Sequence, residues 1–379
     1  MSKINLYLMF GGESPEHEIS IITAKQILKK INKDKYTIYP IYLDKNNKFK
    51  YIPDFVKFDT FKDFNNLSIQ DLTIIIQSKK VIFKIGKLKT LQLPDICLLA
   101  FHGGYGENGT IQGFLDILDI PYTGSGVKGS VYGMDKIVMK YILEENNISI
   151  LPWTYINIDE WNSNIGECIK KIKTISDFPY IVKPSSLGSS IGVKKVENEE
   201  ELEDAISEDF LYDNNVIIEK FGENMREINY SVMQNIKEYE LSESEEIKKD
   251  DIKLFSYDEK YLKGNKKIQN QEGMASSNKI IPANIGDNLD DKIRKVIINA
   301  YKILNSRGIV RLDFLIDQNN DQFYLIEINT IPGSLSFYLW EAKGIPFSET
   351  IDNLIKDALY SFDQKKKILK TFDSPLWKG

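Results

Sequence analysis

Two apolar runs, each followed by a pair of glycines, constrain the fold of this 379-residue chain more than any other feature. The runs are Ile4–Phe10 and Ile96–Phe101, and His102 stands between the second run and its glycines. Uninterrupted apolar runs are typical of strands in a parallel sheet that helices cover on both faces. A helical pattern over 16–30 and an alternating run over 36–43 fit this arrangement. The sequence therefore predicts an N-terminal α/β domain built on a parallel sheet.

Composition excludes several classes of protein. The chain has 49 Lys and Arg against 55 Asp and Glu, a net charge of −6, which argues against binding to a nucleic-acid backbone. No apolar run approaches the roughly 18 residues of a membrane span. The two cysteines, Cys97 and Cys168, fit a reducing compartment, and the two histidines, His17 and His102, exclude a histidine-rich metal site. We expect a cytoplasmic protein that binds neither nucleic acid nor a membrane.

The rest of the chain alternates helical and strand patterns. A polar, lysine-rich stretch at about 238–271 predicts a long surface loop that suits a mobile lid. Residues 44–94 give no clear pattern apart from a possible hairpin at 79–89. The expected helices are 128–146, 199–207, 287–305 and 348–362, and the expected strands are 180–184, 190–196, 216–219, 308–316 and 322–329. Length alone predicts two or three domains.

Four polar side chains mark the last two predicted strands. Arg311 and Asp313 share one face of their strand, and Glu327 and Asn329 share one face of the next, because side chains alternate along a strand. If the strands pair, three oxygen-bearing side chains and a guanidinium converge. Such hard ligands suit magnesium that bridges phosphates, and a surface ladder of ion pairs is the alternative. The turn after Asn329, ending at Gly333, would add backbone amides to the same surface.

The centre of the chain supplies a matching cationic half. Lys183 ends a predicted strand and precedes a loop of small residues, 185–190, whose amides can approach phosphates closely. Lys136 is a second candidate phosphate contact. Either lysine by itself is more often a solvated surface charge. Together with the carboxylates, the two lysines predict a nucleotide site, and the chain has no P-loop motif.

Two glycine motifs of the form G-x-G-x-x-G, at 104–109 and 124–129, also suggest a nicotinamide-dinucleotide site. That site needs an acidic residue at a strand end about 20 positions later. The first motif has no such acid, and after the second the acids Glu144 and Glu145 fall inside a predicted helix. Tight turns at strand ends are the simpler interpretation.

The sequence resembles the D-alanine–D-alanine ligases of the ATP-grasp superfamily. The similarity runs along nearly the whole chain, through GGESPEHEIS, FHGGYGENGTIQGFLDILDIPYTGSGV, MDK, IVKPSSLGSSIGV, IIEK, EKY, VRLDFLI and FYLIEINTIPG. It implies an α/β fold, α+β in part, with a three-domain ATP-grasp architecture and a Rossmann-like N-terminal domain. The implied domains are 1–124, 125–219 and 220–379, and the third carries the lid.

The resemblance assigns a nucleotide site. Lys136, Lys183 and Ser190 would contact the ATP phosphates, and Lys260 in the lid would face the γ-phosphate. The hinge that holds adenine would contain Glu219 and Lys220. Phe221 would flank the adenine ring, and Glu227 would bind the ribose hydroxyls. Two magnesium ions, with manganese as a substitute, would bind Asp313, Glu327 and Asn329.

The resemblance also assigns a site for amino acids. Glu16 would receive the ammonium of the first D-alanine, and Ser189 and Tyr261 would connect it to the lid. His102 would lie near the carboxylate of that substrate, and Arg311 with the Gly333 amide would stabilise an oxyanion.

One segment departs from the pattern of the family. Relatives carry a serine for the second carboxylate where counting from Gly333 reaches Tyr338, so Ser334 or Ser336 would take this role.

The implied activity is the ATP-dependent joining of two D-alanines through an acyl phosphate, for peptidoglycan precursors, by a homodimer. The alternatives are a D-alanine–D-serine ligase or another amino-acid ligase of the superfamily, and a non-catalytic nucleotide-binding relative. Retention of the arginine together with all three metal ligands argues against a protein that only binds nucleotide.

Overall fold

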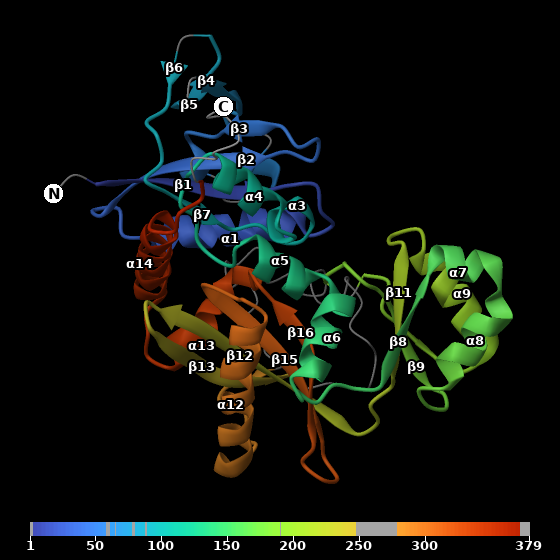
Figure 1. Cartoon of the computed structure of the whole chain (residues 1–379). Helices are drawn as coiled ribbons and strands as arrows, with labels where there is room; N and C mark the ends of the chain where they lie inside the picture. The colour runs from blue at the N-terminus through green and yellow to red at the C-terminus, as the bar shows by residue number, and fades with distance from the viewer. Residues whose placement is uncertain are drawn as a thin grey trace, which may run out of the picture.

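The computed structural model describes residues 3–57, 61–64, 66–77, 80–87, 89–189, 191–247 and 279–371. The described chain forms three sheets, each with its own helices (Figure 1). Three hydrophobic cores accompany them, of which the N-terminal one is also lined by the C-terminal helix α14 (Phe347–Lys366). Within the described ranges, no helix is both long enough and apolar enough to cross a bilayer.

The N-terminal sheet has seven strands in the order β6-β5-β4-β3-β2-β1-β7. The strands are β1 (Ile4–Gly11), β2 (Tyr36–Leu43), β3 (Phe49–Tyr51), β4 (Gln70–Gln77), β5 (Lys80–Ile85), β6 (Lys89–Thr90) and β7 (Ile96–Leu99). Strands β2, β1 and β7 are parallel, as predicted, but β3 to β6 add an antiparallel half. The predicted hairpin is confirmed as β5–β6. Strands β3 and β4 lie in a segment whose residue pattern did not predict them. The accompanying helices are α1 (His17–Lys30), η1 (Phe55–Lys57), α2 (Phe61–Phe64), α3 (Gly104–Glu107) and α4 (Thr110–Ile117).

The central sheet has four strands in the order β10-β9-β11-β8. They are β8 (Trp153–Asn157), β9 (Tyr180–Pro184), β10 (Lys194–Val196) and β11 (Asn215–Lys220). Helices α7 (Ile158–Ser163), α8 (Ile165–Lys173) and α9 (Glu199–Asp209) share its core. The strand predicted over 190–196 is shorter than expected and begins at Lys194.

The third sheet has five strands in the order β14-β13-β12-β15-β16. They are β12 (Met225–Asn235), β13 (Glu238–Ile247), β14 (Lys279–Ile280), β15 (Ile309–Asp317) and β16 (Phe323–Asn329). Helix α12 (Asp287–Ile303) packs on this sheet, and η2 (Gly333–Ser336) and α13 (Phe337–Ala342) follow β16. The sheet positions the candidate site, because the face of β15 and β16 carries the predicted metal ligands.

The predicted surface loop at 238–271 is wrong in its first part, because residues 238–247 form strand β13. The strand was not predicted because most of its residues are polar. Ser242 and Ser244 are buried with hydrogen-bonded hydroxyls, and the buried Glu245 pairs with Lys279, so these polar side chains need no water. Residues 248–271 lie outside the described ranges.

The helix predicted over 128–146 is broken into α5 (Val127–Met134) and α6 (Lys136–Glu145). Asp135 adopts an extended conformation at the break, and its carboxylate accepts hydrogen bonds from the amides of Ile137 and Val138. An aspartate in this capping position stabilises the start of a new helix. The break places Lys136 at the first turn of α6, next to the central sheet.

Candidate active site

Strands β15 and β16 bring the four predicted C-terminal residues together. Arg311 lies opposite Asn329, and Asp313 lies opposite Glu327, in the antiparallel register. Arg311 donates two hydrogen bonds to Asp313, both at 2.7 Å, and Asn329 Nδ2 donates to Asp313 Oδ2 at 3.1 Å. The predicted convergence on one face is therefore confirmed, and Arg311 and Asp313 form an ion pair within it.

The electrostatics of this face favour a cation. Burial raises the pKa of Asp313; Arg311 opposes this shift, whereas Glu327 and Glu227 add to it. Within the described ranges, no group of three or more Asp, Glu, His or Cys side chains is arranged to hold a metal. Two carboxylates and one amide oxygen, from Asp313, Glu327 and Asn329, nevertheless fit magnesium, which keeps several waters of its own.

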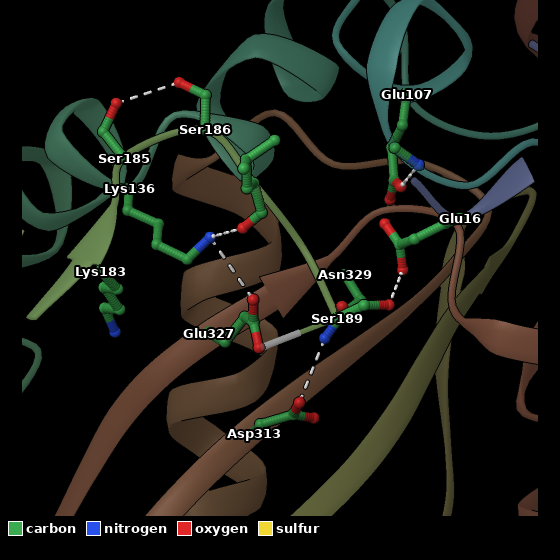
Figure 2. Close-up of polar contacts among 12 residues, drawn as sticks. Glu16, Glu107, Lys136, Lys183, Ser185, Ser186, Ser189, Asp313, Glu327 and Asn329 are labelled. Atoms are coloured by element: carbon green, nitrogen blue, oxygen red, sulfur yellow. Dashed lines mark hydrogen bonds and ion pairs between the residues drawn. The ribbon is translucent and has the colours of Figure 1, made fainter. Parts of the chain in front are cut away.

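Lys136 connects the loop after β9 to this carboxylate face (Figure 2). Its Nζ donates to the carbonyl of Leu187 at 2.6 Å and lies 3.6 Å from Glu327 Oε1. Its backbone amide donates to the carbonyl of Ser185. The lysine is buried, so its charge lies between the small-residue loop and the candidate metal ligands, where phosphates would need it.

Glu219, at the end of β11, lies between two lysines. Lys183 Nζ is 2.7 Å from Glu219 Oε2, and Lys140 forms an ion pair with Glu219 Oε1. Burial by itself would raise the pKa of Glu219, but the two lysines outweigh it and lower the pKa to about 2. Sequence reasoning missed Lys140, although it lies one helical turn after Lys136 and so shares its face of α6.

The other predicted nucleotide residues lie on neighbouring elements. Lys220 is exposed at the end of β11, and the ring of Phe221 has Lys195 Nζ 4.6 Å from its centroid. Glu227 lies on β12, and its charge acts on Asp313 across the sheet. Three predicted residues lie outside the described ranges: Ser190, Lys260 and Tyr261.

Glu16 directly precedes α1 and contacts the loop that follows β9 of the central sheet. Ser189 donates a hydrogen bond to its carboxylate, and Glu107 lies beside it (Figure 2). Burial raises the pKa of Glu16 to about 7, and the neighbouring charge of Glu107 adds to the shift. Sequence reasoning missed Glu107, which accepts hydrogen bonds from the Gly103 and Ile331 amides and from Thr330 Oγ1. Its position inside the motif GGYGENGT was the available signal.

His102 lies next to the turn after β16, because its ring bonds to the Ile331 backbone. Burial lowers the pKa of His102 to about 4, so the ring is neutral at physiological pH. Gly333 begins η2, and Ser334 and Ser336 are buried in it. Within the described part of the chain, Ser336 Oγ is buried and has no hydrogen-bond partner.

Tyr338 occupies the position where the pattern of the family predicts a serine. Its hydroxyl donates to Glu245 Oε1 at 2.8 Å and accepts from Lys279 Nζ at 3.0 Å. Since these partners already use the hydroxyl, Ser334 and Ser336 are the better candidates for a substrate carboxylate. The sequence did not predict a role for Glu245 or Lys279. Glu245 lies in the segment whose polar composition predicted a loop.

The two glycine motifs serve packing. A Cβ added to Gly106 would lie 2.2 Å from Phe101 Cβ, and one added to Gly129 would lie 2.3 Å from the carbonyl oxygen of Asn305. Both glycines therefore allow close approach between segments of the protein. This close packing agrees with the interpretation of these motifs as tight turns.

Comparison with known proteins agrees with this geometry. Residues 5–125 match the family described as D-ala D-ala ligase N-terminus, and residues 142–356 match D-ala D-ala ligase C-terminus. The chain is 41% identical over 378 residues to the D-alanine–D-alanine ligase of Thermosipho africanus, covering 99% of this chain and 98% of the relative. It is 43% identical over 370 residues to the ligase of Thermosipho melanesiensis, covering 96% of each.

Solved structures show the same fold. The D-alanine–D-alanine ligase from Coxiella burnetii has a TM-score of 0.79 at 25% identity, covering 97% of each chain. The VanG D-Ala:D-Ser ligase from Enterococcus faecalis has a TM-score of 0.76 at 25% identity, covering 95% of this chain and all of the other. The Bacillus anthracis ligase complexed with ATP has a TM-score of 0.67 at 26% identity, covering 96% and 99%. The chain belongs to the D-alanine–D-alanine ligase family.

Proposed function

We propose that this chain joins two D-alanines into D-alanyl-D-alanine at the expense of ATP, for the synthesis of peptidoglycan precursors. The observation that carries the proposal is the meeting of three sets of groups on adjoining surfaces. They are the Glu16 carboxylate with Ser189, the Lys136 and Lys183 cations, and the carboxylate face of β15 and β16. An amino acid, a triphosphate and a divalent cation each find groups of suitable charge there.

The first step activates a carboxylate. Glu16 binds the ammonium of the first D-alanine, and the substrate carboxylate attacks the γ-phosphate of ATP, giving an acyl phosphate and ADP. Lys136 and Lys183 neutralise phosphate charge, and the protein contributes mainly by positioning the reactants. Glu219, Lys220 and Phe221 hold the adenine, Glu227 binds the ribose, and Ser190 and Lys260 contact phosphates.

Magnesium bound by Asp313, Glu327 and Asn329 would supply positive charge to the phosphates, and manganese would substitute for it. The oxygen donors of these side chains are the ones that such hard cations prefer. Arg311 holds the Asp313 carboxylate in a fixed orientation through two hydrogen bonds.

The second step forms the peptide bond. The amine of a second D-alanine attacks the acyl carbon, and phosphate leaves after a tetrahedral oxyanion. Arg311 and the Gly333 amide stabilise that oxyanion, while Ser334 and Ser336 receive the second carboxylate. His102 borders the first substrate. Tyr261 has the role that the family resemblance implies, which is to connect Glu16 and Ser189 to the lid.

We further propose three domains, 1–124, 125–219 and 220–379, in a cytoplasmic homodimer. Two free, buried cysteines support a reducing compartment. The core under the third sheet includes Met139 and Leu143 of α6, which belongs to the proposed second domain. The second and third domains therefore share part of a hydrophobic core.

A phosphate-release assay with ATP, magnesium and a panel of D-amino acids and D-lactate tests the proposal, with products identified by mass. D-alanine alone should release phosphate and give the dipeptide. D-serine as the second substrate is the other candidate, favoured by the Ser336 hydroxyl, which has no hydrogen-bond partner among the described residues and could bond a substrate hydroxyl. A preference for D-alanine plus D-serine over D-alanine alone would select it. No release with any pair containing D-alanine would reject both.

A further inference from the structure

The turn after β16 holds an uncommon backbone conformation. Three consecutive residues other than glycine, Ser334, Leu335 and Ser336, have φ angles of 54°, 52° and 49°. Each left-handed residue with a side chain costs roughly 1 kcal/mol or more. A run of three persists only where surrounding contacts hold it, and such strain concentrates at ligand-binding segments.

One of those contacts comes from a distant helix. The Ser334 amide donates to Thr23 Oγ1 at 3.1 Å, and Thr23 is completely buried in α1, 311 residues earlier. The same oxygen lies 2.8 Å from Nε2 of His102. A hydroxyl can accept one hydrogen bond and donate another at once. Thr23 therefore connects the left-handed turn to the histidine next to the candidate substrate site.

The direction of these hydrogen bonds follows from the donors. The Ser334 N–H can only donate, so it occupies a lone pair of Thr23 Oγ1. The His102 ring also bonds to the Ile331 backbone; when it donates there through Nδ1, Nε2 accepts from the Thr23 hydroxyl. The resulting sequence, Ser334 amide to Thr23 to His102, connects the turn to the ring.

The held turn contains the groups that face the second substrate in the proposed reaction. The Gly333 amide comes directly before Ser334, and the buried hydroxyl of Ser336 has no partner among the described residues. A buried hydroxyl without a partner is costly unless a ligand satisfies it. A shift of the turn would therefore displace the oxyanion donor and the hydroxyl together.

We propose that Thr23 is a positioning residue for the second-substrate subsite, acting through the Ser334 amide and His102. It touches neither substrate. The inference rests on the proposed function, since it concerns the second D-alanine of that reaction. It predicts that the threonine hydroxyl, rather than its volume, determines how well this subsite binds.

The test compares Thr23→Val, which keeps the shape and removes the hydroxyl, with Thr23→Ser, which keeps the hydroxyl. Thr350→Val is the matched control, because Thr350 is also completely buried in a helix and its hydroxyl bonds to the carbonyl of Pro346 in the same turn. Rates are measured against D-alanine, whose concentration dependence contains one KM for each subsite, and separately against ATP.

Thr23→Val should raise the KM of the second D-alanine about fivefold or more, since it removes the hydrogen bond to the Ser334 amide, worth about 1 kcal/mol, and the one to His102. The KM for ATP should stay within about twofold, and Thr23→Ser and Thr350→Val should behave like the wild type. Equal effects of Thr23→Val on both subsites and on ATP, or an effect of Thr23→Ser as large as that of valine, would overturn the inference. A crystal structure of Thr23→Val with Ser334–Ser336 unchanged and an unaltered KM would also overturn it. An inactive wild type rejects the proposed function, and this role with it.

Discussion

Ser189 donates a hydrogen bond to the carboxylate of Glu16, although 173 residues separate them. Glu16 precedes the first helix of the N-terminal sheet, and Ser189 lies in the loop after β9 of the central sheet. The bond thus joins two sheets at the point where the first D-alanine is proposed to bind. It also orients one oxygen of a carboxylate that burial makes reluctant to ionise.

Replacing Ser189 by alanine should therefore weaken binding of the first D-alanine. A hydrogen bond to a charged group contributes about 1.5–3 kcal/mol, so kcat/KM for D-alanine should fall roughly 10- to 100-fold. The KM for ATP should change little. Steady-state kinetics of ADP release measure both, with Ser163→Ala, an exposed serine at the end of α7, as the control. Unchanged kinetics for D-alanine would remove Ser189 from the site.

The raised pKa of Glu16 makes a prediction about stability. Its pKa is about 7 in the folded chain and about 4.5 when unfolded, so the folded state holds the extra proton between these values. The protonated group's contribution to stability is complete below about pH 4.5 and is lost as the pH rises through 7. Glu16→Gln, which cannot ionise, should gain stability relative to wild type by up to about 3 kcal/mol between pH 5 and pH 8.

Thermal unfolding of both proteins at the two pH values tests this expectation. The difference in Tm, Glu16→Gln minus wild type, should be larger at pH 8. Equal differences at both pH values would mean that burial does not shift this carboxyl.

Lys140 should stabilise the buried Glu219 carboxylate together with Lys183. Both side chains are buried, with exposures of 1% and 4%, and removing one partner of a buried ion pair costs about 3–5 kcal/mol. Lys140→Met should lower the free energy of unfolding by less than that, because Lys183 stays paired with Glu219. The double variant Lys140→Met/Glu219→Gln should be less stable than Lys140→Met, since it also leaves the mostly buried Lys183 without its carboxylate.

Urea unfolding measures these differences. Lys170→Met is the control, because the Lys170–Glu167 pair on α8 is exposed and should matter by less than about 1 kcal/mol. A double variant at least as stable as Lys140→Met would show that Lys183 does not depend on the Glu219 charge.

Glu327→Gln should raise the magnesium concentration needed for half-maximal activity by roughly tenfold or more. Loss of a group that only hydrogen-bonds to a metal ligand already lowers metal affinity by about that factor. EDTA should abolish the wild-type activity, and magnesium or manganese should restore it. A magnesium titration of the rate provides the measurement, with Glu349→Gln on α14 as the control. The same magnesium requirement in Glu327→Gln would exclude this carboxylate as a ligand.

Local patterns predicted much of this fold. Apolar runs located β1, β2 and β7, and alternation along β15 and β16 correctly placed Arg311, Asp313, Glu327 and Asn329 on one face. These predictions succeeded because each depends on side chains only a few residues apart. The strand β13 was missed because its polar side chains are compensated by partners from other elements, such as Lys279 for Glu245.

The sequence by itself predicted most of the strands and helices and the types of side chain that the site contains. Only the tertiary structure decided which of these side chains meet. The Lys140–Glu219 pair and the Thr23–Ser334 hydrogen bond join residues 79 and 311 positions apart, and no periodicity encodes such distances. Both depend on how sheets and helices pack, because burial removes water and leaves each charged or polar group only the partners that packing brings to it.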